Sequence, residues 1–346
     1  MLKKKKVLFF SSVKDVQLFK VTGFYVEDIQ VLKDGGFEVI TTNKISDFLK
    51  FWTYDVAFLY FYKISLIPAF LARFALKKVI FTGGIDEFGE MEITVKKRNI
   101  FKALFKLNYM LSNVCNVVSK NDLENVSHIL GEFPKQGVNK LSYFPHSIDT
   151  DIYNTSAIFN KEDFITSICW MATVANVKRK GLDTSVELFS EIKKKYPNFK
   201  LVLIGAWGDG KSYIEKLVEE RNLKNDVIFT GSISEKKKIE ILANSKYYFQ
   251  LSTYEGFGIA VLEAMALKNY IFHTGKGGLK DTVENRGCII EPNVGPSVAV
   301  QLFDNLEKDY DINNPLLESN RQHILTRFSR KSRSDYFKEI ISNFYV

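Results

Sequence analysis

The chain has 346 residues, of which 46% are hydrophobic and 25% charged, with seven prolines and twenty glycines. These values are ordinary for a globular protein, exclude a low-complexity chain and leave room for two domains. The net charge of +8 is unevenly distributed, since residues 1–150 hold 21 basic and 15 acidic side chains. This excess indicates an anionic partner, either a membrane surface or a nucleic acid, or simply a domain with excess lysine.

The cysteines and histidines predict neither disulfides nor a metal site. The three cysteines stand far apart, at 115, 169 and 288, which favours reduced thiols and a cytoplasmic protein. The four histidines are scattered, and no Cys/His cluster has metal-ligand spacing, so we expect no bound metal. The apolar run after Lys3–Lys6 ends at Ser11, too short for a signal peptide or a membrane span. No other segment approaches a transmembrane helix in length.

Residues 1–150 alternate apolar runs with helical patterns. We expect strands at 7–10, 38–41, 55–60, 78–82 and 116–119, and helices at 24–34, 64–76, 97–112 and 121–130. Strands that alternate with helices are typical of βαβ units, so this part predicts a Rossmann-like domain with a parallel sheet.

The segment 142–153 carries Pro145 and polar residues without periodicity, which indicates a domain boundary near Thr150. A second alternating series follows it and predicts a second α/β domain over 151–327. Its expected strands lie at 167–171, 200–204, 226–229, 247–251, 270–273 and 288–290, and its helices at 181–195, 212–221, 235–243, 259–267 and 296–307. A last helix is expected at 328–343.

Two glutamates flank a glycine-containing turn between a predicted strand and a predicted helix. Glu255 lies in the turn, and Glu263 lies about one turn inside the helix. Gly256 and Gly258 let a ligand approach the main chain, and a helix N-terminus favours anions. Carboxylates beside an anion site suit a ligand with phosphates and hydroxyls, such as a nucleotide-sugar. The alternative is a surface Glu and a capping Glu on an ordinary βα unit.

The segment from Tyr254 to Ala266 resembles the E-x7-E signature of family 4 glycosyltransferases, a retaining group with the GT-B fold. The resemblance covers most of residues 140–300, and the first domain only in architecture. It implies an α/β protein whose two Rossmann-like domains, 1–150 and 151–327, face a central cleft, with 328–346 crossing back to the first domain.

The resemblance also implies an activity. Such an enzyme moves a sugar from a nucleotide diphosphate sugar to a saccharide or lipid-linked acceptor hydroxyl, with retained anomeric configuration and without metal or cofactor. Assembly of bacterial surface polysaccharide or glycolipid is the setting that the family suggests. Glu255 would hold the donor sugar, Glu263 would accept ribose hydroxyls, and the loop at Ser232 would hold the base. The implied donor-binding residues are Glu263, Gly256, Phe257, Gly258, Ile259, Ser232, Ile233 and Gly205.

Three cations, Lys178, Arg179 and Lys180, are expected to open the helix after the first strand of the second domain. Cations at a helix start oppose the helix dipole unless an anion such as a diphosphate balances them. The family has Lys-Gly here and an arginine slightly earlier, where this chain has Thr173. The resemblance therefore assigns Lys180 a catalytic role beside Glu255, with Arg179 as a candidate replacement. A solvated basic turn is the alternative.

The segment Gly205–Ser212 matches the P-loop pattern Gly-x4-Gly-Lys-Ser between a strand and a helix. A P-loop nucleotide-binding protein is therefore a rival hypothesis. Three observations oppose it: the preceding strand is the second of its domain, no later strand ends in a magnesium-binding Asp, and the paired glutamates would be unexplained. A GT-B sugar-nucleotide epimerase is another alternative, and a protein that only binds anions or nucleic acid lacks a recognised module.

The acceptor side is expected in the first domain. Gly23 precedes the first long helix, and Gly83 and Gly84 end a strand. Many relatives have a histidine near this strand end, which this chain lacks, so His146 is a candidate substitute or a structural residue.

The segment 96–107 is a basic amphipathic helix, with cations at Arg98, Lys102 and Lys106 and an apolar face that includes Ile100, Phe101, Leu104 and Phe105. Such a helix suits peripheral contact with an anionic membrane, to which 64–78 could add. A helix that packs on the core with a solvated rim is the alternative.

Overall fold

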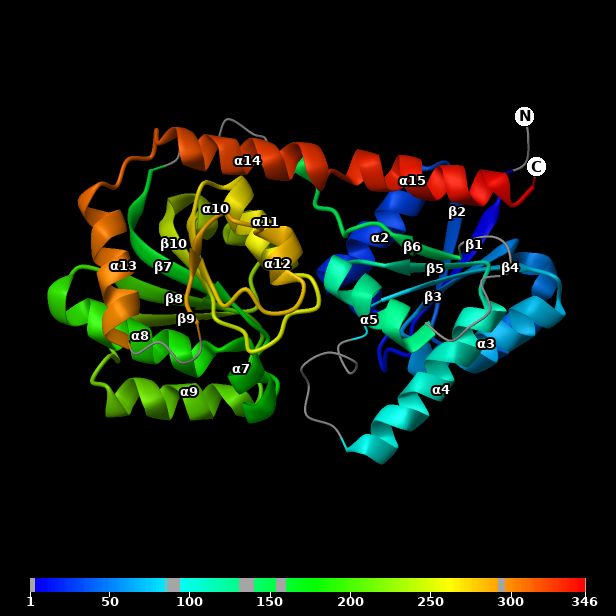
Figure 1. The fold of residues 1–346 in the computed structure, drawn as a ribbon, viewed down its shortest axis with the longest axis horizontal. Helices are drawn as coiled ribbons and strands as arrows, with labels where there is room; N and C mark the ends of the chain where they lie inside the picture. Colours follow the sequence, from blue (N-terminus) through cyan, green and yellow to red (C-terminus); the bar gives the residue numbers. More distant parts are fainter. Residues whose placement is uncertain are drawn as a thin grey trace. The chain divides into compact units, whose positions relative to one another are not determined.

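A computed structural model describes residues 4–83, 85, 94–130, 140–153, 160–291 and 296–345. The chain divides into two compact units. Unit 1 comprises Met1–Asp149 and Phe328–Val346, and unit 2 comprises Thr150–Arg327. Each unit contains one parallel six-stranded sheet with helices on its faces, as the sequence predicts (Figure 1).

The sheet of unit 1 has the strand order β2-β1-β3-β4-β5-β6. Its strands are β1 (Lys6–Phe10), β2 (Glu38–Thr42), β3 (Val56–Tyr60), β4 (Lys78–Thr82), β5 (Val114–Val117) and β6 (Leu141–Tyr143). Its helices are α1 (Leu18–Val21), α2 (Gly23–Asp34), α3 (Tyr62–Phe74), α4 (Val95–Leu111), α5 (Lys120–Leu130) and α15 (Arg330–Asn343). Short 3-10 turns at Ile45–Leu49 and Phe51–Thr53 precede β3.

Strand β1 is buried on both faces, so alternate residues enter different cores. Leu8 and Phe10 pack with residues of α3, α4 and α5. Val7 and Phe9 pack with residues of α2 and with Phe337 of the C-terminal helix α15. A parallel sheet needs such cover on both faces, which explains why its strands are continuous apolar runs.

A buried ion pair fastens α15 to α2. The guanidinium of Arg333 donates to Asp28 Oδ1 at 2.6 Å and to Oδ2 at 2.9 Å, and both side chains are fully buried. Arg333 also donates to the carbonyls of Phe144 and Pro145 at 2.9 and 2.6 Å. The predicted return of the C-terminal helix to the first unit is confirmed.

The sheet of unit 2 has the order β12-β11-β10-β7-β8-β9. Its strands are β7 (Glu162–Ile168), β8 (Lys200–Ile204), β9 (Val227–Gly231), β10 (Ser245–Gln250), β11 (Tyr270–His273) and β12 (Cys288–Ile289). Its helices are α6 (Thr150–Tyr153), α7 (Val174–Lys180), α8 (Leu182–Lys195), α9 (Asp209–Glu220), α10 (Glu235–Asn244), α11 (Ile259–Ala266), α12 (Leu279–Thr282), α13 (Pro296–Lys308) and α14 (Pro315–Arg327).

Several predicted boundaries were wrong. The strand predicted at 167–171 is β7, which ends at Ile168, because β7 buries the polar Thr166 and Ser167 whereas Trp170 is 62% exposed. The strand predicted at 116–119 likewise lies two residues earlier, as β5. The helix predicted at 181–195 is preceded by a separate helix, α7, which Gly181 ends in the left-handed conformation. Strand β6 and helix α6 fall partly in the segment expected to be aperiodic.

Helices α1, α12 and α14 have no counterpart among the predicted elements. The first two have four residues each, too few for a periodic pattern. Helix α14 buries the polar Asn320 and Arg321 beside Leu317 and Ile324, so its buried face does not form an apolar pattern in the sequence. Across the described ranges, no helix combines the length and hydrophobicity that a bilayer crossing requires.

Candidate functional site

In the sheet of unit 2, the strand order reverses at one place, between two neighbouring strands. The chain proceeds from β7 outward to β8 and β9, then returns to the other side of β7 with β10, β11 and β12. In open α/β sheets, ligands bind outside the carboxyl ends of the strands at such a reversal. The reversal lies between β7 and β10, so the segments after these two strands form the candidate site.

The turn between α7 and α8 packs directly against the segment that follows β10. Gly181 adopts φ +66, and a Cβ there would lie 1.9 Å from the carbonyl oxygen of Leu251. The Thr253 N–H donates to the carbonyl of Arg179 at 2.9 Å. Only glycine fits at this contact, which brings Lys180 to the turn that carries Glu255.

Lys180 and Glu255 form an ion pair at this point, with Lys180 Nζ 2.5 Å from Glu255 Oε2. The same oxygen accepts bonds from Gln250 Nε2 at 3.1 Å and Ser252 Oγ at 3.3 Å. The Tyr248 hydroxyl in turn donates to Gln250 Oε1 at 3.0 Å. Glu255 is thus 9% exposed and held by a polar network that starts inside β10. Gln250 was not predicted as a site residue. Its sequence position could have indicated it, since it is a polar residue inside an otherwise apolar run.

Arg179 lies beside the pair. Its guanidinium donates to the carbonyl of Tyr254 at 3.3 Å and to Asn176 Oδ1 at 3.0 Å. Burial raises the pKa of the Cys169 thiol to about 11, while the charges of Lys180 and Arg179 act to lower it and that of Glu255 to raise it. The end of β7 therefore lies close to all three predicted catalytic side chains.

The dipole argument for these cations was wrong. Residues Lys178, Arg179 and Lys180 form the last turn of α7, and α8 begins only after Gly181. Cations are favoured at a helix C-terminus, so no anion is required to balance them. Thr173, which stands where the family has an arginine, caps α7 by accepting the N–H of Asn176.

The glycine turn of the signature leads into α11 at Ile259. Gly258 precedes the helix with φ +97, and no side chain caps it. The N–H groups of Val261 and Leu262 return to the Gly258 carbonyl, whereas the first amides of a helix have no acceptor one turn earlier. The turn therefore presents the positive end of α11 next to Glu255, as an anion site requires. Phe257 is buried in this turn.

Glu263 lies on α11 in a second polar cluster. Its Oε1 is 2.8 Å from Lys238 Nζ, which also lies 2.9 Å from Glu235 Oε1. The Tyr153 hydroxyl donates to Glu235 at 2.8 Å. Burial raises the pKa of Glu263 although Lys238 acts to lower it. Lys238 and Tyr153 were not predicted, since their approach to Glu263 depends on the packing of α10 and α6.

The loop Gly205–Gly208 packs against protein where a P-loop would hold phosphate. The N–H groups of Asp209 and Gly210 donate to the carbonyls of Ala172 and Met171, both at 3.1 Å. A Cβ on Gly205 would lie 1.9 Å from the Cys169 carbonyl oxygen. Because these amides are occupied and the glycines serve close packing, the geometry opposes the P-loop alternative. Ser232 is exposed and Ile233 half-buried in the loop after β9.

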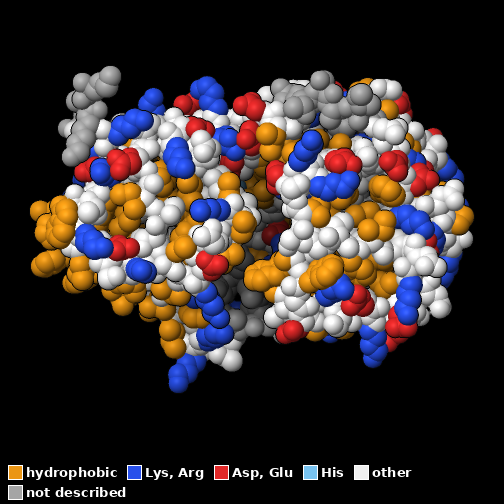
Figure 2. Space-filling view, turned by 180° about the vertical axis from the view of Figure 1, so that it is seen from behind, with side chains coloured by type: hydrophobic (Ala, Val, Ile, Leu, Met, Phe, Trp, Pro, Cys, Tyr) orange, Lys and Arg blue, Asp and Glu red, His pale blue; other side chains and the backbone are white. Residues whose placement is uncertain are grey.

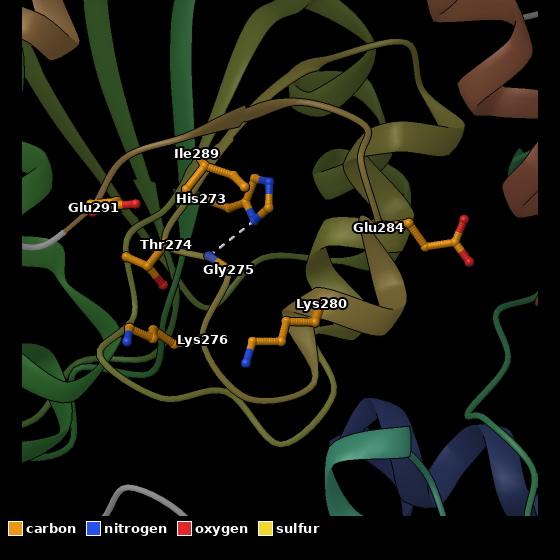
Figure 3. Close-up of a pocket in the computed structure, with 8 residues that line it drawn as sticks. All are labelled: His273, Thr274, Gly275, Lys276, Lys280, Glu284, Ile289 and Glu291. Atoms are coloured by element: carbon orange, nitrogen blue, oxygen red, sulfur yellow. Dashed lines mark hydrogen bonds between the residues drawn. The ribbon is translucent and has the colours of Figure 1, made fainter.

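A pocket of about 400 Å³ opens at the carboxyl ends of β11 and β12 (Figure 3). Its lining residues are His273, Thr274, Gly275, Lys276, Lys280, Glu284, Ile289 and Glu291. Figure 3 shows Glu284 pointing away from the other side chains, and this carboxylate pairs with Arg327.

This pocket shares its wall with the Glu255 turn. Gly278 N–H donates to the Glu255 carbonyl at 2.6 Å, and Thr274 Oγ1 donates to the Ser252 carbonyl at 2.6 Å. His273 accepts the Gly275 N–H at Nδ1, at 3.2 Å, and burial lowers its pKa to about 4. The imidazole is therefore neutral at pH 7, and the loop after β11 lines the cavity.

The predicted acceptor residues lie in unit 1. Gly23 is the first residue of α2, and a Cβ there would meet no atom within 4 Å. Gly83 has φ +128 and packs against Phe61. Gly84 lies outside the described residues. His146 is 8% exposed, and burial and then the Arg333 charge lower its pKa to about 3, so its position favours a structural role.

Comparison with known proteins shows what this chain is similar to. Residues 171–323 match the family described as glycosyl transferases group 1. The chain is 27% identical over 157 residues to a phosphatidylinositol N-acetylglucosaminyltransferase component from Arabidopsis thaliana, a match that covers 44% of this chain and 34% of that protein. It is 30% identical over 149 residues to the uncharacterized glycosyltransferase YqgM from Bacillus subtilis, covering 43% and 41%. The matched region thus spans less than half the length of these relatives.

A solved structure extends the likeness to both units. The Anabaena protein HepE, crystallised with UDP and glucose, superposes with a TM-score of 0.76 at 13% identity, covering 98% of this chain and 100% of that one. At this identity the likeness shows the fold. Residues 171–323 are thus similar to the glycosyl transferases group 1 family, and the chain has the GT-B fold.

Proposed function

We propose that this chain is a retaining, metal-independent glycosyltransferase that moves a sugar from a nucleoside diphosphate sugar to an acceptor hydroxyl. We place it in the cytoplasm, in the assembly of bacterial surface polysaccharide or glycolipid. The observation that carries the proposal is the Lys180–Glu255 ion pair, which stands at the topological reversal beside the uncapped start of α11. The family match over residues 171–323 includes both residues, and relatives with glycosyltransferase names match 43–44% of the chain.

The arrangement suits departure of a diphosphate. An ammonium has three donors, so Lys180 can keep its bond to Glu255 and still bind a phosphate oxygen. The amides at the start of α11 supply further positive charge where negative charge develops on the leaving group. Arg179, which contacts the Tyr254 carbonyl next to Glu255, adds a guanidinium that suits phosphate oxygens.

The reaction breaks the bond between the anomeric carbon and the diphosphate oxygen and forms a bond from that carbon to the acceptor oxygen. The proton of the acceptor hydroxyl passes to the leaving diphosphate, and both events occur on one face of the sugar. Glu255 holds the sugar hydroxyls and stabilises the positive charge on the ring, so no covalent nucleophile is needed. Glu263, fixed by Lys238, accepts the ribose hydroxyls.

Substitution of Glu255 tests the proposal. Purified protein is screened with UDP-, GDP- and ADP-sugars and simple acceptors, and the anomeric configuration of the product is determined by NMR. We expect Glu255→Gln and Glu255→Ala to lower transfer by about 100-fold or more while thermal unfolding stays near that of wild type. Glu220→Ala, an exposed carboxylate of the same unit, is the matched control.

Each part of the proposal has an outcome that would contradict it. Unchanged turnover in Glu255→Ala would remove the assigned site, and an inverted product would remove the retaining mechanism. Loss of transfer on addition of EDTA would remove metal independence. Release of an altered sugar without any acceptor would favour the epimerase alternative.

We further propose that unit 1 contacts an anionic membrane through α3 and α4. Helix α3 exposes Ile64, Ile67, Phe70 and Phe74 at helical spacing, each between 48% and 81%, while its smaller residues face the core. Contiguous exposed apolar surface is unusual in a monomer. Figure 2 shows hydrophobic side chains gathered along the lower left margin over these helices, with basic side chains around them.

The charge of both helices favours a lipid surface. Neither α3 nor α4 contains an acidic residue, and together they carry seven lysines and arginines. The predicted apolar face of α4 is only partly available, because Phe105 is fully buried and Phe101 and Leu104 pack against the core. Ile100 at 50% and Met110 at 56% remain exposed instead.

Vesicle sedimentation tests this contact. We expect Lys102→Ala/Lys106→Ala to weaken binding to phosphatidylglycerol-containing vesicles by about tenfold or more, since each cation near such a surface contributes roughly 1 kcal/mol. Phe70→Ser/Phe74→Ser should weaken it as well, and Lys216→Ala/Lys224→Ala in unit 2 is the control. Equal binding of all variants, or equal binding to neutral vesicles, would exclude the membrane contact.

A further inference from the structure

The segment Gly205–Ser212 carries a feature that the proposed chemistry leaves unused. The amides of Asp209 and Gly210 are occupied, but Trp207, at the tip of the loop, is 57% exposed. The loop follows β8 and precedes α9, so the indole stands at the carboxyl edge of the sheet, on the same edge as Glu255. Large exposed aromatic side chains at such an edge are candidates for ligand contact.

Two neighbours hold the indole in place. The backbone of Trp207 bridges to that of Met171, beyond β7. A Cβ on Gly231 would approach the indole to 3.2 Å, so the glycine leaves room for the ring at the start of the loop that contains Ser232. Lys211 Nζ lies 4.4 Å from the ring centroid, and Glu215 pairs with this lysine. Trp207 remains 57% exposed despite these contacts.

The distance along the edge fits one ligand. Trp207 follows β8, Glu255 follows β10, and β7 lies between these two strands. Neighbouring strands are about 4.8 Å apart, so the ends of β8 and β10 are separated by roughly 10 Å. A nucleoside diphosphate sugar carries its base and its sugar at opposite ends, with ribose and diphosphate between them. Lys180, which comes from the segment after β7, stands where the diphosphate would cross.

We propose that Trp207 is the stacking platform for the nucleobase of the donor. This inference rests on the proposed function and adds the site of base binding to it. Every base has a π face, so the platform selects nucleotides over simple sugar phosphates, and it does not select one base over another. Lys211, with its cation over the ring, either remains on the face opposite the base or is displaced by it.

Intrinsic fluorescence tests the contact directly, because the chain has three tryptophans, at 52, 170 and 207. In Trp52→Phe/Trp170→Phe, Trp207 is the sole reporter. We expect saturable quenching by UDP or GDP, and none by ribose 5-phosphate or pyrophosphate, which lack a base. Calorimetry should show that Trp207→Ala weakens binding of the same nucleotide by about ten- to hundredfold, whereas Trp207→Phe keeps affinity close to wild type. Trp52→Ala, 72% exposed in unit 1, is the matched control.

The outcomes separate this inference from the proposed function. Wild-type affinity in Trp207→Ala, or equal quenching by ribose 5-phosphate, overturns the platform while sugar transfer can still stand. Absence of nucleoside diphosphate binding in wild type overturns both. If Trp207→Ala does not fold, the fluorescence titration of the double variant decides alone.

Discussion

The two units share one architecture and differ in what occupies the carboxyl edge at the reversal of the sheet. In unit 1 the reversal lies between β1 and β3, and aromatic rings fill it: Phe24 packs on Tyr60 and Phe61, and Tyr25 on Tyr60. In unit 2 the corresponding place between β7 and β10 holds Lys180 and Glu255. The same fold therefore places packed aromatic rings at this edge in one unit and a charged pair in the other.

This difference indicates how polar groups are used in each unit. In unit 1 the fully buried Arg333 and Asp28 bind each other, and Arg333 also donates to main-chain carbonyls, so the pair serves to attach α15. In unit 2 the ion pair of Lys180 and Glu255 lies next to the start of α11, and the Glu255 turn borders a pocket. Proteins that share a fold differ in function because their sites differ. Three substitutions test this difference between the two units.

The largest effect on stability is expected from Arg333→Met in unit 1. Burial acts to raise the pKa of Asp28, but the charge and hydrogen bonds of Arg333, together with His146 and Tyr60, outweigh it, so the pKa lies below its usual value. Removing the guanidinium leaves a buried carboxylate uncompensated, which should cost about 3–5 kcal/mol of unfolding free energy. Urea denaturation measures this loss, and hydrogen exchange should show α15 released first. Lys331→Met on the exposed side of α15 should change little, and an equal loss in that control would refute a specific role for the pair.

A smaller effect is expected from Gly181→Ala in unit 2. The residue adopts φ +66, and its new Cβ would meet the Leu251 carbonyl, so strain of about 1–3 kcal/mol should follow. This contact places Lys180 against Glu255. The loss of transfer, expressed as a free energy, should therefore exceed the loss of unfolding free energy. Gly36→Ala in unit 1, which has φ +93 but open space for a Cβ, is the control that should strain the backbone and keep transfer. Wild-type transfer in Gly181→Ala would show that the close contact does not position the site.

The smallest effect is a pH dependence in unit 1. Burial lowers the pKa of His146 to about 3, so the unfolded chain binds a proton below about pH 6.5 that the folded chain does not. Stability should therefore be retained above pH 6.5 and fall by about 1–2 kcal/mol as the pH drops from 7 to 5. His146→Gln should flatten this slope. The measurement is the urea midpoint against pH, with Trp52 as the reporter of unit 1 in Trp170→Phe/Trp207→Phe; an unchanged slope would contradict the assignment.

Much of the architecture could be predicted from the sequence because it depends on local patterns. Continuous apolar runs such as Lys200–Ile204 and Tyr270–His273 become β8 and β11 with the expected bounds. The spacing of Glu255 and Glu263 and the glycines between them also depend only on neighbouring residues. These features determined a two-unit α/β protein and the stretch of chain on which its candidate site is built.

The tertiary structure alone decided which distant residues meet that stretch. Lys180 reaches Glu255 across 75 positions of sequence because Gly181 packs on Leu251, and no local pattern encodes that contact. The same holds for Lys238 beside Glu263 and for Trp207 against Gly231, which depend on the order of strands in the sheet. The structure also decided at which end of a helix the cations before Gly181 lie. They form the last turn of α7, where the helix dipole favours them.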